Sequence, residues 1–254
     1  MLIDTHTHLY LEQFDSDIDE VINRALEKGV DRFYLPNIDS STTEAMLALE
    51  TRFPERCFAM MGLHPCSVKD NYQDELDHVR KQLDGRTFCA IGEIGIDLYW
   101  DKTHIEEQKD ALIQQIHMAM ERDLPIVIHS REATDIIIDI VRREKNDSLR
   151  GIFHCFTGSL DQAKEIIDLG FLLGIGGVLT YKNTDLRETL ASIPLDHIVL
   201  ETDSPYLAPV PYRGKRNESG YIYHVADTLA RLKGITITQL GEITSQTALN
   251  LFKN

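Results

Sequence analysis

Short runs of apolar, often β-branched residues alternate with amphipathic stretches along the whole chain. PIVIH (125–129) and DHIVLE (196–201) are almost continuously apolar, as expected of strands that are covered on both faces. The pattern predicts eight strands, at residues 2–6, 32–37, 57–62, 89–93, 125–129, 150–154, 171–175 and 198–202.

Helical spacing of apolar residues fills the gaps between these strands. It predicts helices at 17–28, 42–52, 74–84, 104–122, 133–145, 160–169 and 185–192, and two more at 220–233 and 238–251. Strands that alternate with helices indicate βαβ units and a parallel sheet. The chain has 254 residues, and one (β/α)8 barrel typically takes about 250. We therefore expect an α/β fold, a TIM-like (β/α)8 barrel, in which residues 1–254 form a single domain.

Composition places the chain among ordinary globular proteins, with 43% hydrophobic and 26% charged residues. No apolar run approaches the roughly 18 residues of a membrane span, and the first residues lack the pattern of a secretory signal. The four cysteines form no CxxC pair, which favours reduced thiols. These features predict a cytoplasmic protein that does not contact membranes, and we expect a monomer.

Potential metal ligands recur where predicted strands run out into loops. In a parallel barrel these carboxyl ends meet at one face, where active sites form. The HxH pair of the first strand is informative because side chains two apart on a strand point the same way. The pair alone is weak, and polar residues that merely cap a barrel are the alternative, but the joint pattern over five strands favours a metal site. The candidates are His6, His8, Glu93, His129, His154 and Asp203.

Six ligands are too many for one tetrahedral zinc ion. They suit two divalent cations about 3.5–4 Å apart that share a carboxylate. Glu93, from the middle strand of the set, is the expected bridge, and Asp203 can both bind an ion and accept a proton from water. The remaining ligands divide into His6 and His8 with Asp203, and His129 with His154. Histidine and carboxylate together favour zinc or manganese over magnesium.

The sequence resembles the TatD family of metal-dependent deoxyribonucleases, within the wider group of amidohydrolase-like barrels. The resemblance runs in family order from residue 4 to residue 219, through DTHTHL, GLHP, GEIGIDLYW, PIVIHSR, FHCFTGS, ETDSPYLAP and PYRGKRNES. It implies a TIM-like barrel, magnesium-dependent hydrolysis of DNA phosphodiesters, commonly as a 3′→5′ exonuclease, and the same six residues as metal ligands. Many amidohydrolase relatives bridge their metals with a carboxylated lysine, so Glu93 at the bridge favours the nuclease branch.

Several residues around the predicted metals are candidates for substrate contacts. His64, at the end of the third strand, is expected to face the mouth and to contact a phosphate oxygen or assist the leaving group, unless it only caps the strand. Arg131 shares the parity of His129 and either contacts substrate or pairs with an acid. Arg213, Lys215 and Arg216 follow the last strand and either grip phosphates, which position a nucleic acid without reading its sequence, or form a solvated loop.

Other residues are assigned supporting roles. Asp4 and Glu201 are expected to orient ligand histidines through hydrogen bonds. Tyr99 and Trp100 could stack on a base, but packing beneath the loop is the favoured interpretation. Cys155 has the opposite parity to its neighbour His154 and is expected to belong to the core.

Net charge narrows the choice of function. A charge of −15 disfavours a general nucleic-acid-binding module, whereas bound cations would reverse the potential at the mouth. The leading hypothesis is a metal-dependent hydrolase that acts on DNA. The alternative is an amidase, deacylase or esterase on the same barrel, because fold does not decide between these reactions. A purely structural metal protein is disfavoured because structural metals usually have closed coordination.

Overall fold

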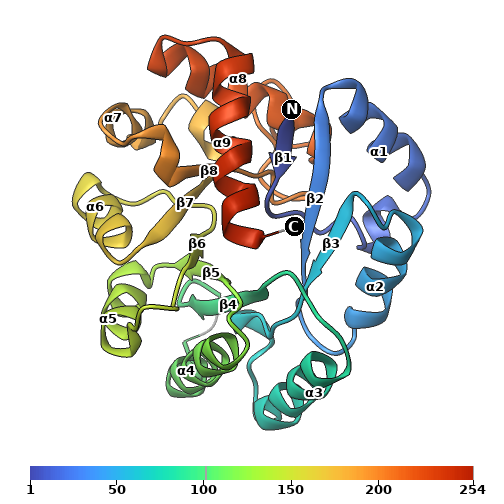
Figure 1. Ribbon diagram of the computed structural model, residues 1–254, viewed down its shortest axis with the longest axis vertical. Helices are drawn as coiled ribbons and strands as arrows, with labels where there is room; N and C mark the ends of the chain where they lie inside the picture. Colours follow the sequence, from blue (N-terminus) through green and yellow to red (C-terminus); the bar gives the residue numbers. More distant parts are fainter. Residues whose placement is uncertain (101, 254) are drawn as a thin grey trace.

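The computed structural model describes residues 1–100 and 102–253 and shows a ring of parallel strands surrounded by helices (Figure 1). The strands are β1 (Leu2–Asp4), β2 (Val30–Pro36), β3 (Cys57–Met60), β4 (Ile91–Asp97), β5 (Ile126–Arg131), β6 (Gly151–Phe153), β7 (Phe171–Ile175) and β8 (Ile198–Leu200). Neighbours in sequence are neighbours in space, in the orders β1-β2-β3 and β4-β5-β6-β7-β8.

Backbone hydrogen bonds join these two sheets at both seams. Between β3 and β4, the Met61 N–H donates to the Ala90 carbonyl at 3.2 Å, and the Gly92 N–H donates to the Met61 carbonyl at 3.1 Å. Between β8 and β1, the Thr5 N–H donates to the Leu200 carbonyl at 3.0 Å. The predicted TIM-like barrel is therefore confirmed.

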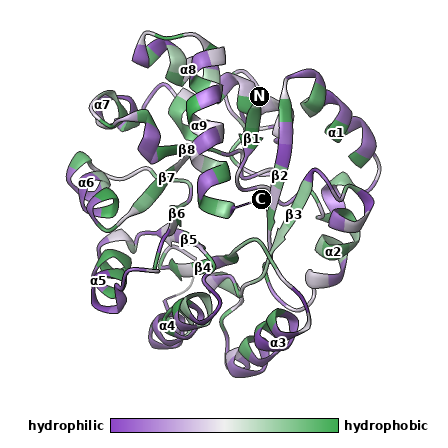
Figure 2. Ribbon diagram, in the orientation of Figure 1, coloured by the Kyte–Doolittle hydropathy of each residue, from purple (hydrophilic) through white to green (hydrophobic). Residues whose placement is uncertain are grey.

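Helices cover the outside of the ring. They are α1 (Ile18–Glu27), α2 (Thr43–Arg52), α3 (Tyr72–Gly85), α4 (Ile105–Glu121), α5 (Thr134–Glu144), α6 (Leu160–Asp168), α7 (Leu186–Ala191), α8 (Ile222–Lys233) and α9 (Ile237–Phe252). In α5, for example, Ile137, Ile138 and Val141 are buried while Arg142 and Arg143 are exposed. Figure 2 shows the same division, with hydrophilic residues concentrated on the outer helices. Across the described ranges, no helix has the length and apolar character that a membrane crossing requires.

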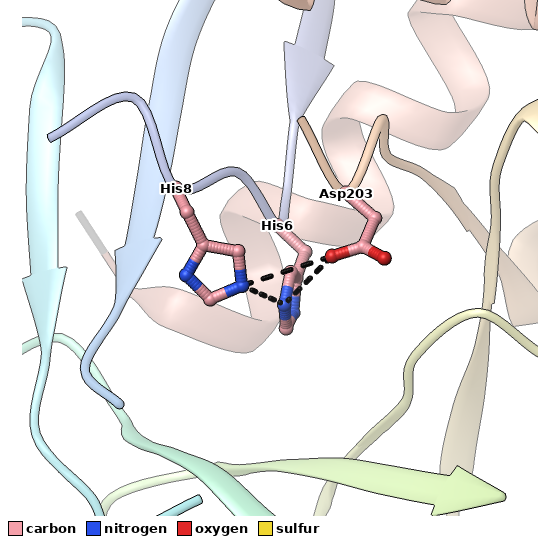
Figure 3. A group of neighbouring side chains, drawn as sticks. All are labelled: His6, His8 and Asp203. Atoms are coloured by element: carbon pink, nitrogen blue, oxygen red, sulfur yellow. Dashed lines mark hydrogen bonds and ion pairs between the residues drawn. The ribbon is translucent and has the colours of Figure 1, made fainter. Parts of the chain in front are cut away.

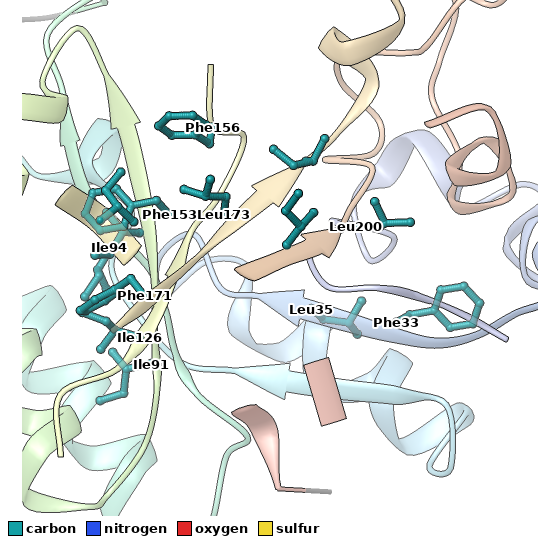
Figure 4. Close-up of a cluster of buried hydrophobic side chains, with 14 of the residues drawn as sticks. Phe33, Leu35, Ile91, Ile94, Ile126, Phe153, Phe156, Phe171, Leu173 and Leu200 are labelled. Atoms are coloured by element: carbon teal, nitrogen blue, oxygen red, sulfur yellow. The ribbon is translucent and has the colours of Figure 1, made fainter. Parts of the chain in front are cut away.

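The hydrophobic core has two parts, and neither covers the end of the barrel where the strands finish. Buried side chains such as Ile126, Phe153 and Leu173 fill the space between strands and helices (Figure 4). At the amino ends of the strands, α9 closes the barrel, and the ring of Phe252 stacks on Tyr34 with centroids 4.0 Å apart. The opposite end, where the strands finish, remains for a site.

The inward side chains form layers along the strands. Val127 and Ile152 are buried, and each lies two positions before a histidine of the cluster. His129 follows Val127 within β5, and His154 follows Ile152 just past the end of β6. Alternation on each strand therefore gives an apolar layer below and a polar layer at the mouth, as in other barrels of this type.

Most predicted elements end within two residues of the observed ones, but β4 differs. It was predicted to stop at Glu93 and instead continues to Asp97, so the prediction that Glu93 ends a strand is wrong. Gly92 lies opposite Val127 and Ile94 opposite Ile128, which leaves Glu93 outside the regular pairing. Such a bulge re-aims a side chain, and here it directs a mid-strand carboxylate to the mouth.

Candidate metal centre

The histidines after β1 and the aspartate after β8 meet at one point. The Nε2 atoms of His6 and His8 are 3.3 Å apart, and each lies 3.7 Å from Asp203 Oδ1 (Figure 3). The Asp203 N–H donates to the His6 carbonyl at 2.9 Å. Because this backbone bond fixes the two loops against each other, the three side chains are held on one side of the mouth.

Glu93 lies at the centre of the remaining ligands. Its Oε2 atom is 3.0 Å from His6 Nε2 and 3.5 Å from His8 Nε2. Its Oε1 atom is 2.8 Å from both His129 Nδ1 and His154 Nε2. Only 2% of the Glu93 side chain is exposed. One buried carboxylate therefore faces two sets of imidazoles, one set on each oxygen, and the structure brings all six candidates together.

The charges of this cluster depend on one another. Burial raises the pKa of Glu93, but the neighbouring histidines, led by His154, hold it well below its usual range, so Glu93 is ionised. Burial and the charge of His154 lower the pKa of His6 well below its usual value, which leaves His6 neutral. Burial raises the pKa of Asp203 to about 6. The cluster thus combines an ionised carboxylate with at least one neutral imidazole.

Hydrogen bonds around the cluster fix which ring nitrogen of His8 and of His129 points inward. The Tyr10 hydroxyl donates to the Pro36 carbonyl, so it accepts from His8 Nδ1, 2.9 Å away, and His8 Nε2 keeps its lone pair. The Nε2–H of His129 donates to Asp97 Oδ2 at 3.0 Å, which leaves Nδ1 facing Glu93. Histidine binds metal through a neutral nitrogen whose partner nitrogen is held by a hydrogen bond. Both imidazoles therefore fit the requirements of a metal ligand.

The donor atoms are also close enough to share ions. Three sets of three ligand atoms each lie within 4.8 Å of one another: His6, His8 and Asp203; His6, Glu93 and His154; and His64, Glu93 and His129. A mixture of imidazole and carboxylate donors is suited to first-row divalent ions. The residues present thus fit a divalent metal centre.

His64 belongs to one of these sets, but its hydrogen bonds indicate a different role. Its Nδ1 atom accepts a hydrogen bond from the Cys66 N–H at 3.0 Å. A neutral imidazole then carries its proton on Nε2, which lies 3.4 Å from Glu93 Oε1. His64 lines the mouth as expected and presents a donor there, the form required for contact with an oxygen of a substrate.

Glu201 lies beside the centre, where it was expected. Its Oε1 atom accepts from the Cys155 N–H at 2.5 Å and lies 3.4 Å from His154 Nδ1. Together with Glu93, Glu201 raises the pKa of His154 well above its usual value despite burial. Cys155 is half-buried and belongs to none of the three ligand sets among the residues described.

Asp4 has a different role from the one predicted. Its Oδ1 atom accepts from the Thr202 N–H at 2.9 Å, and its Oδ2 atom accepts from the Thr202 hydroxyl at 2.6 Å. Within residues 1–100 and 102–253 it has no hydrogen bond to a histidine, so the prediction that it orients a ligand histidine is wrong. Asp4 instead ties the end of β1 to the residue before Asp203.

Asp97 was not selected from the sequence, although it holds His129. A signal was present, because Glu93, Gly95 and Asp97 alternate along GEIGID and share one face of a strand. A strand that ends at Glu93 leaves Asp97 in the following loop, where alternation no longer predicts its direction. With β4 at its full length, Asp97 reaches the mouth at the strand's carboxyl end.

A cavity of about 790 Å³ opens above the cluster. Its outer lining includes Trp100, Arg131, Tyr206, Arg213 and Lys215. The Arg213 guanidinium lies 4.4 Å from the centroid of the Tyr181 ring. Two of the three basic residues predicted in this loop are therefore at the mouth.

Arg216 is the exception. Its guanidinium donates to both carboxylate oxygens of Asp17, each at 2.7 Å, and to the Gln13 carbonyl at 2.6 Å. These bonds fasten the loop to the segment before α1. Three of its five N–H groups are used in these bonds, and Arg216 is absent from the lining of the cavity. The predicted contact of Arg216 with phosphate is corrected accordingly, because its side chain fastens the loop outside the cavity.

The role of Glu201 in metal binding can be tested without replacing it, by a substitution at Gly174 in β7. A Cβ atom at Gly174 would lie 2.3 Å from Glu201 Oε2 and 3.0 Å from the His154 Cα. We expect Gly174→Ala to displace Glu201 and lower metal affinity by roughly 10- to 100-fold, the usual effect of losing such support. Metal titration measures this. Gly85→Ala is the control, since its added Cβ meets nothing within 4 Å; equal affinities of the two variants would contradict the role of Glu201.

Comparison with known proteins identifies related chains of the same length. The sequence profile of the family described as TatD related DNase matches residues 3–253. An uncharacterized metal-dependent hydrolase, YabD of Bacillus subtilis, is 40% identical over 255 residues, which cover 100% of this chain and 99% of that protein. The 3'-5' ssDNA/RNA exonuclease TatD of Pectobacterium carotovorum is 29% identical, with 99% of each chain covered. The crystal structure of YjjV, a TatD homolog from Escherichia coli, superimposes with a TM-score of 0.94 at 29% identity, covering 100% of this chain and 98% of that one.

Proposed function

The chain belongs to the family of TatD-related DNases, a family of metal-dependent hydrolases, and from this premise we propose that it hydrolyses phosphodiester bonds of DNA. The observation that carries the proposal is the position of Glu93, whose two oxygens each face a separate set of imidazoles. Such a carboxylate can bind two ions at once, and pairs of closely spaced ions occur in nucleases and phosphatases.

Two divalent ions fit the donor atoms. His6, His8 and Asp203 would hold one ion, His129 and His154 the other, and Glu93 both. When bound, the ions lower the pKa of a water molecule and stabilise negative charge on the attacking and leaving oxygens. Magnesium, manganese and zinc are the candidate metals.

The protein's own groups move the proton and position the substrate. Asp203 accepts the proton of the attacking water, since its side chain is 15% exposed and so reaches the cavity. His64 donates its Nε2–H to an oxygen of the phosphate or of the leaving group. Arg213 and Lys215 hold neighbouring phosphates from the loop after β8.

The direction of cleavage is proposed from a relative. The homologous protein named as a 3'-5' ssDNA/RNA exonuclease is similar along its whole length, and we propose the same polarity here. Metal analysis of the purified protein, followed by digestion of 5′-labelled single- and double-stranded oligonucleotides, tests this directly. A ladder that shortens from the 3′ end is expected. Hydrolysis of acyl amides or esters with intact oligonucleotides would contradict the proposal and support the alternative enzyme class.

The basic residues at the mouth predict a salt dependence. Replacing Arg213 and Lys215 together with alanine is expected to weaken binding of single-stranded DNA. Log affinity falls with log salt concentration, and each lost phosphate contact makes this fall less steep by about 0.7 in the slope. Binding is measured between low and physiological salt. Lys164→Ala, an exposed change on α6 away from the cavity, is the control. An unchanged slope in the double variant would show that neither residue contacts phosphate.

A further inference from the structure

We propose that Tyr99, Trp100 and Arg131 form a platform on which an unpaired nucleobase of the substrate stacks beside the metal centre. We call these three residues the rim platform. The inference rests on the proposed DNA-cleaving function and adds to it a subsite for a base.

The aromatic members of the rim platform are open to solvent. Tyr99 is 51% exposed and Trp100 is 69% exposed, so the expectation that they pack beneath the loop is wrong. Their rings meet edge to face, with centroids 4.9 Å apart and planes at 89°. Trp100 also lines the cavity above the cluster. Large aromatic surfaces exposed at a cavity mouth are suited to binding, because a folded chain gains nothing by leaving them in water.

Arg131 completes the rim platform. Its guanidinium carbon lies 3.9 Å from the centroid of the Tyr99 ring and 5.4 Å from that of Trp100. In the part of the chain that the structure describes, the side chain pairs with no carboxylate. The predicted alternative, an ion pair with an acid, is therefore not observed. A guanidinium in this setting offers a flat face to a base and positive charge to the adjoining phosphate.

A single carboxylate connects the rim platform to the metal centre. Asp97 Oδ1 accepts from the N–H groups of Tyr99, at 2.9 Å, and Trp100, at 3.2 Å. Its other oxygen accepts from His129 Nε2. The Leu98 N–H also donates to the Arg131 carbonyl at 3.0 Å, which joins the ends of β4 and β5. A base held here would therefore be fixed in position relative to the ions, and such positioning aligns the reacting phosphate.

The arrangement favours an unpaired base over a duplex. The rim platform follows β4 and β5, whereas the basic loop of Arg213 and Lys215 follows β8, and both border the same cavity. A strand crossing the cavity can place its phosphates toward that loop and one base on the rings. A base within a duplex is already stacked on its neighbours and would first have to leave the helix.

Trp100 supplies a direct signal for this contact, because it is the only tryptophan in the chain. The metal-loaded protein is mixed with short single-stranded thymidylate oligonucleotides in a stopped-flow fluorimeter, and emission is recorded before turnover. Saturable quenching in the concentration range of KM is expected. Unchanged emission at oligonucleotide concentrations that saturate cleavage would overturn the proposal.

Changes in the protein and in the substrate test the same contact through enzyme activity. On single-stranded DNA, we expect Trp100→Ala to raise KM by roughly 5- to 100-fold, the effect of losing one base stack, and Trp100→Phe to stay near the wild type. Oligonucleotides with one abasic position, moved along the strand, should show the same loss for the wild-type protein at a single position. Trp100→Ala should suffer no additional loss there, because base and ring act together.

The controls separate this inference from the proposed function. Tyr223 on α8 is 38% exposed with the Lys28 ammonium 5.7 Å from its ring centroid, and it lies outside the cavity lining, so Tyr223→Ala should behave as the wild type. If the wild type cleaves no oligonucleotide, the proposed function fails and the base subsite with it. If it cleaves and Trp100→Ala is unchanged on every substrate, only the rim platform is refuted.

Discussion

Replacing Glu93 with glutamine is expected to abolish hydrolysis while the barrel stays folded. Glutamine has the shape of glutamate, but one of its two terminal atoms becomes an amide nitrogen that cannot bind a cation. The Glu93 oxygens face His6 on one side and His129 and His154 on the other, so either orientation of the amide loses one ion. Losing about 4 kcal/mol of transition-state stabilisation corresponds to about a thousandfold in kcat. Steady-state kinetics and metal content of the purified variant measure both effects.

A matched change elsewhere shows whether the loss is specific. Glu50 is also partly buried, with 17% of its side chain exposed, and it accepts a hydrogen bond from the Ala59 N–H and pairs with Arg86. Glu50→Gln should retain activity and metal content. A Glu93→Gln protein with two bound ions and the kcat of the wild type would refute the bridging role.

The direction of side chains on regular strands was predictable because it follows from a period of two. His129 and His154 continue the inward face of Val127 and Ile152, and the structure places both at the mouth. Glu93 was predictable for a chemical reason, because it is a carboxylate on a strand among strands that carry histidines. The predicted end of its strand was too early. The bulge that aims it depends on pairing with β5, and a single sequence carries little information about such a local irregularity.

The hydrogen-bond partners of side chains were less predictable than the directions in which the side chains point. Asp4 does point inward, but the neighbour it meets is Thr202, because the loop after β8 passes over the end of β1. Arg216 lies in the expected loop, yet the path of that loop places it against Asp17 and away from the mouth. Neither loop path follows from periodicity, since turns are set by local hydrogen bonds and long-range contacts.

The exposed aromatics show a further limit of sequence reasoning. An aromatic pair next to a strand end is more often part of a core, and this prior favoured packing for Tyr99 and Trp100. Their exposure arises because Asp97 caps their backbone N–H groups and turns the chain outward. The same carboxylate holds His129, so Asp97 both supports a ligand and gives rise to the rim platform.

Asp203→Asn is expected to lower kcat by roughly 10²- to 10⁴-fold, the contribution usual for a positioned proton acceptor, with little change in KM. Asparagine keeps the size of the side chain and tolerates the left-handed backbone of this position, where φ is 55°. Its amide oxygen can still approach an ion, but the amide cannot take up a proton. Turnover at saturating metal therefore separates the two roles of Asp203, since added metal can compensate for weak binding and cannot supply a base.

Asp123→Asn is the matched control for this change, because Asp123 also has a left-handed backbone, with φ of 52°, and lies far from the site, paired with Arg150 and Lys253. It should leave kcat unchanged. If excess metal returns the Asp203→Asn protein to the kcat of the wild type, Asp203 acts only as a ligand. Another group at the mouth would then have to receive the proton.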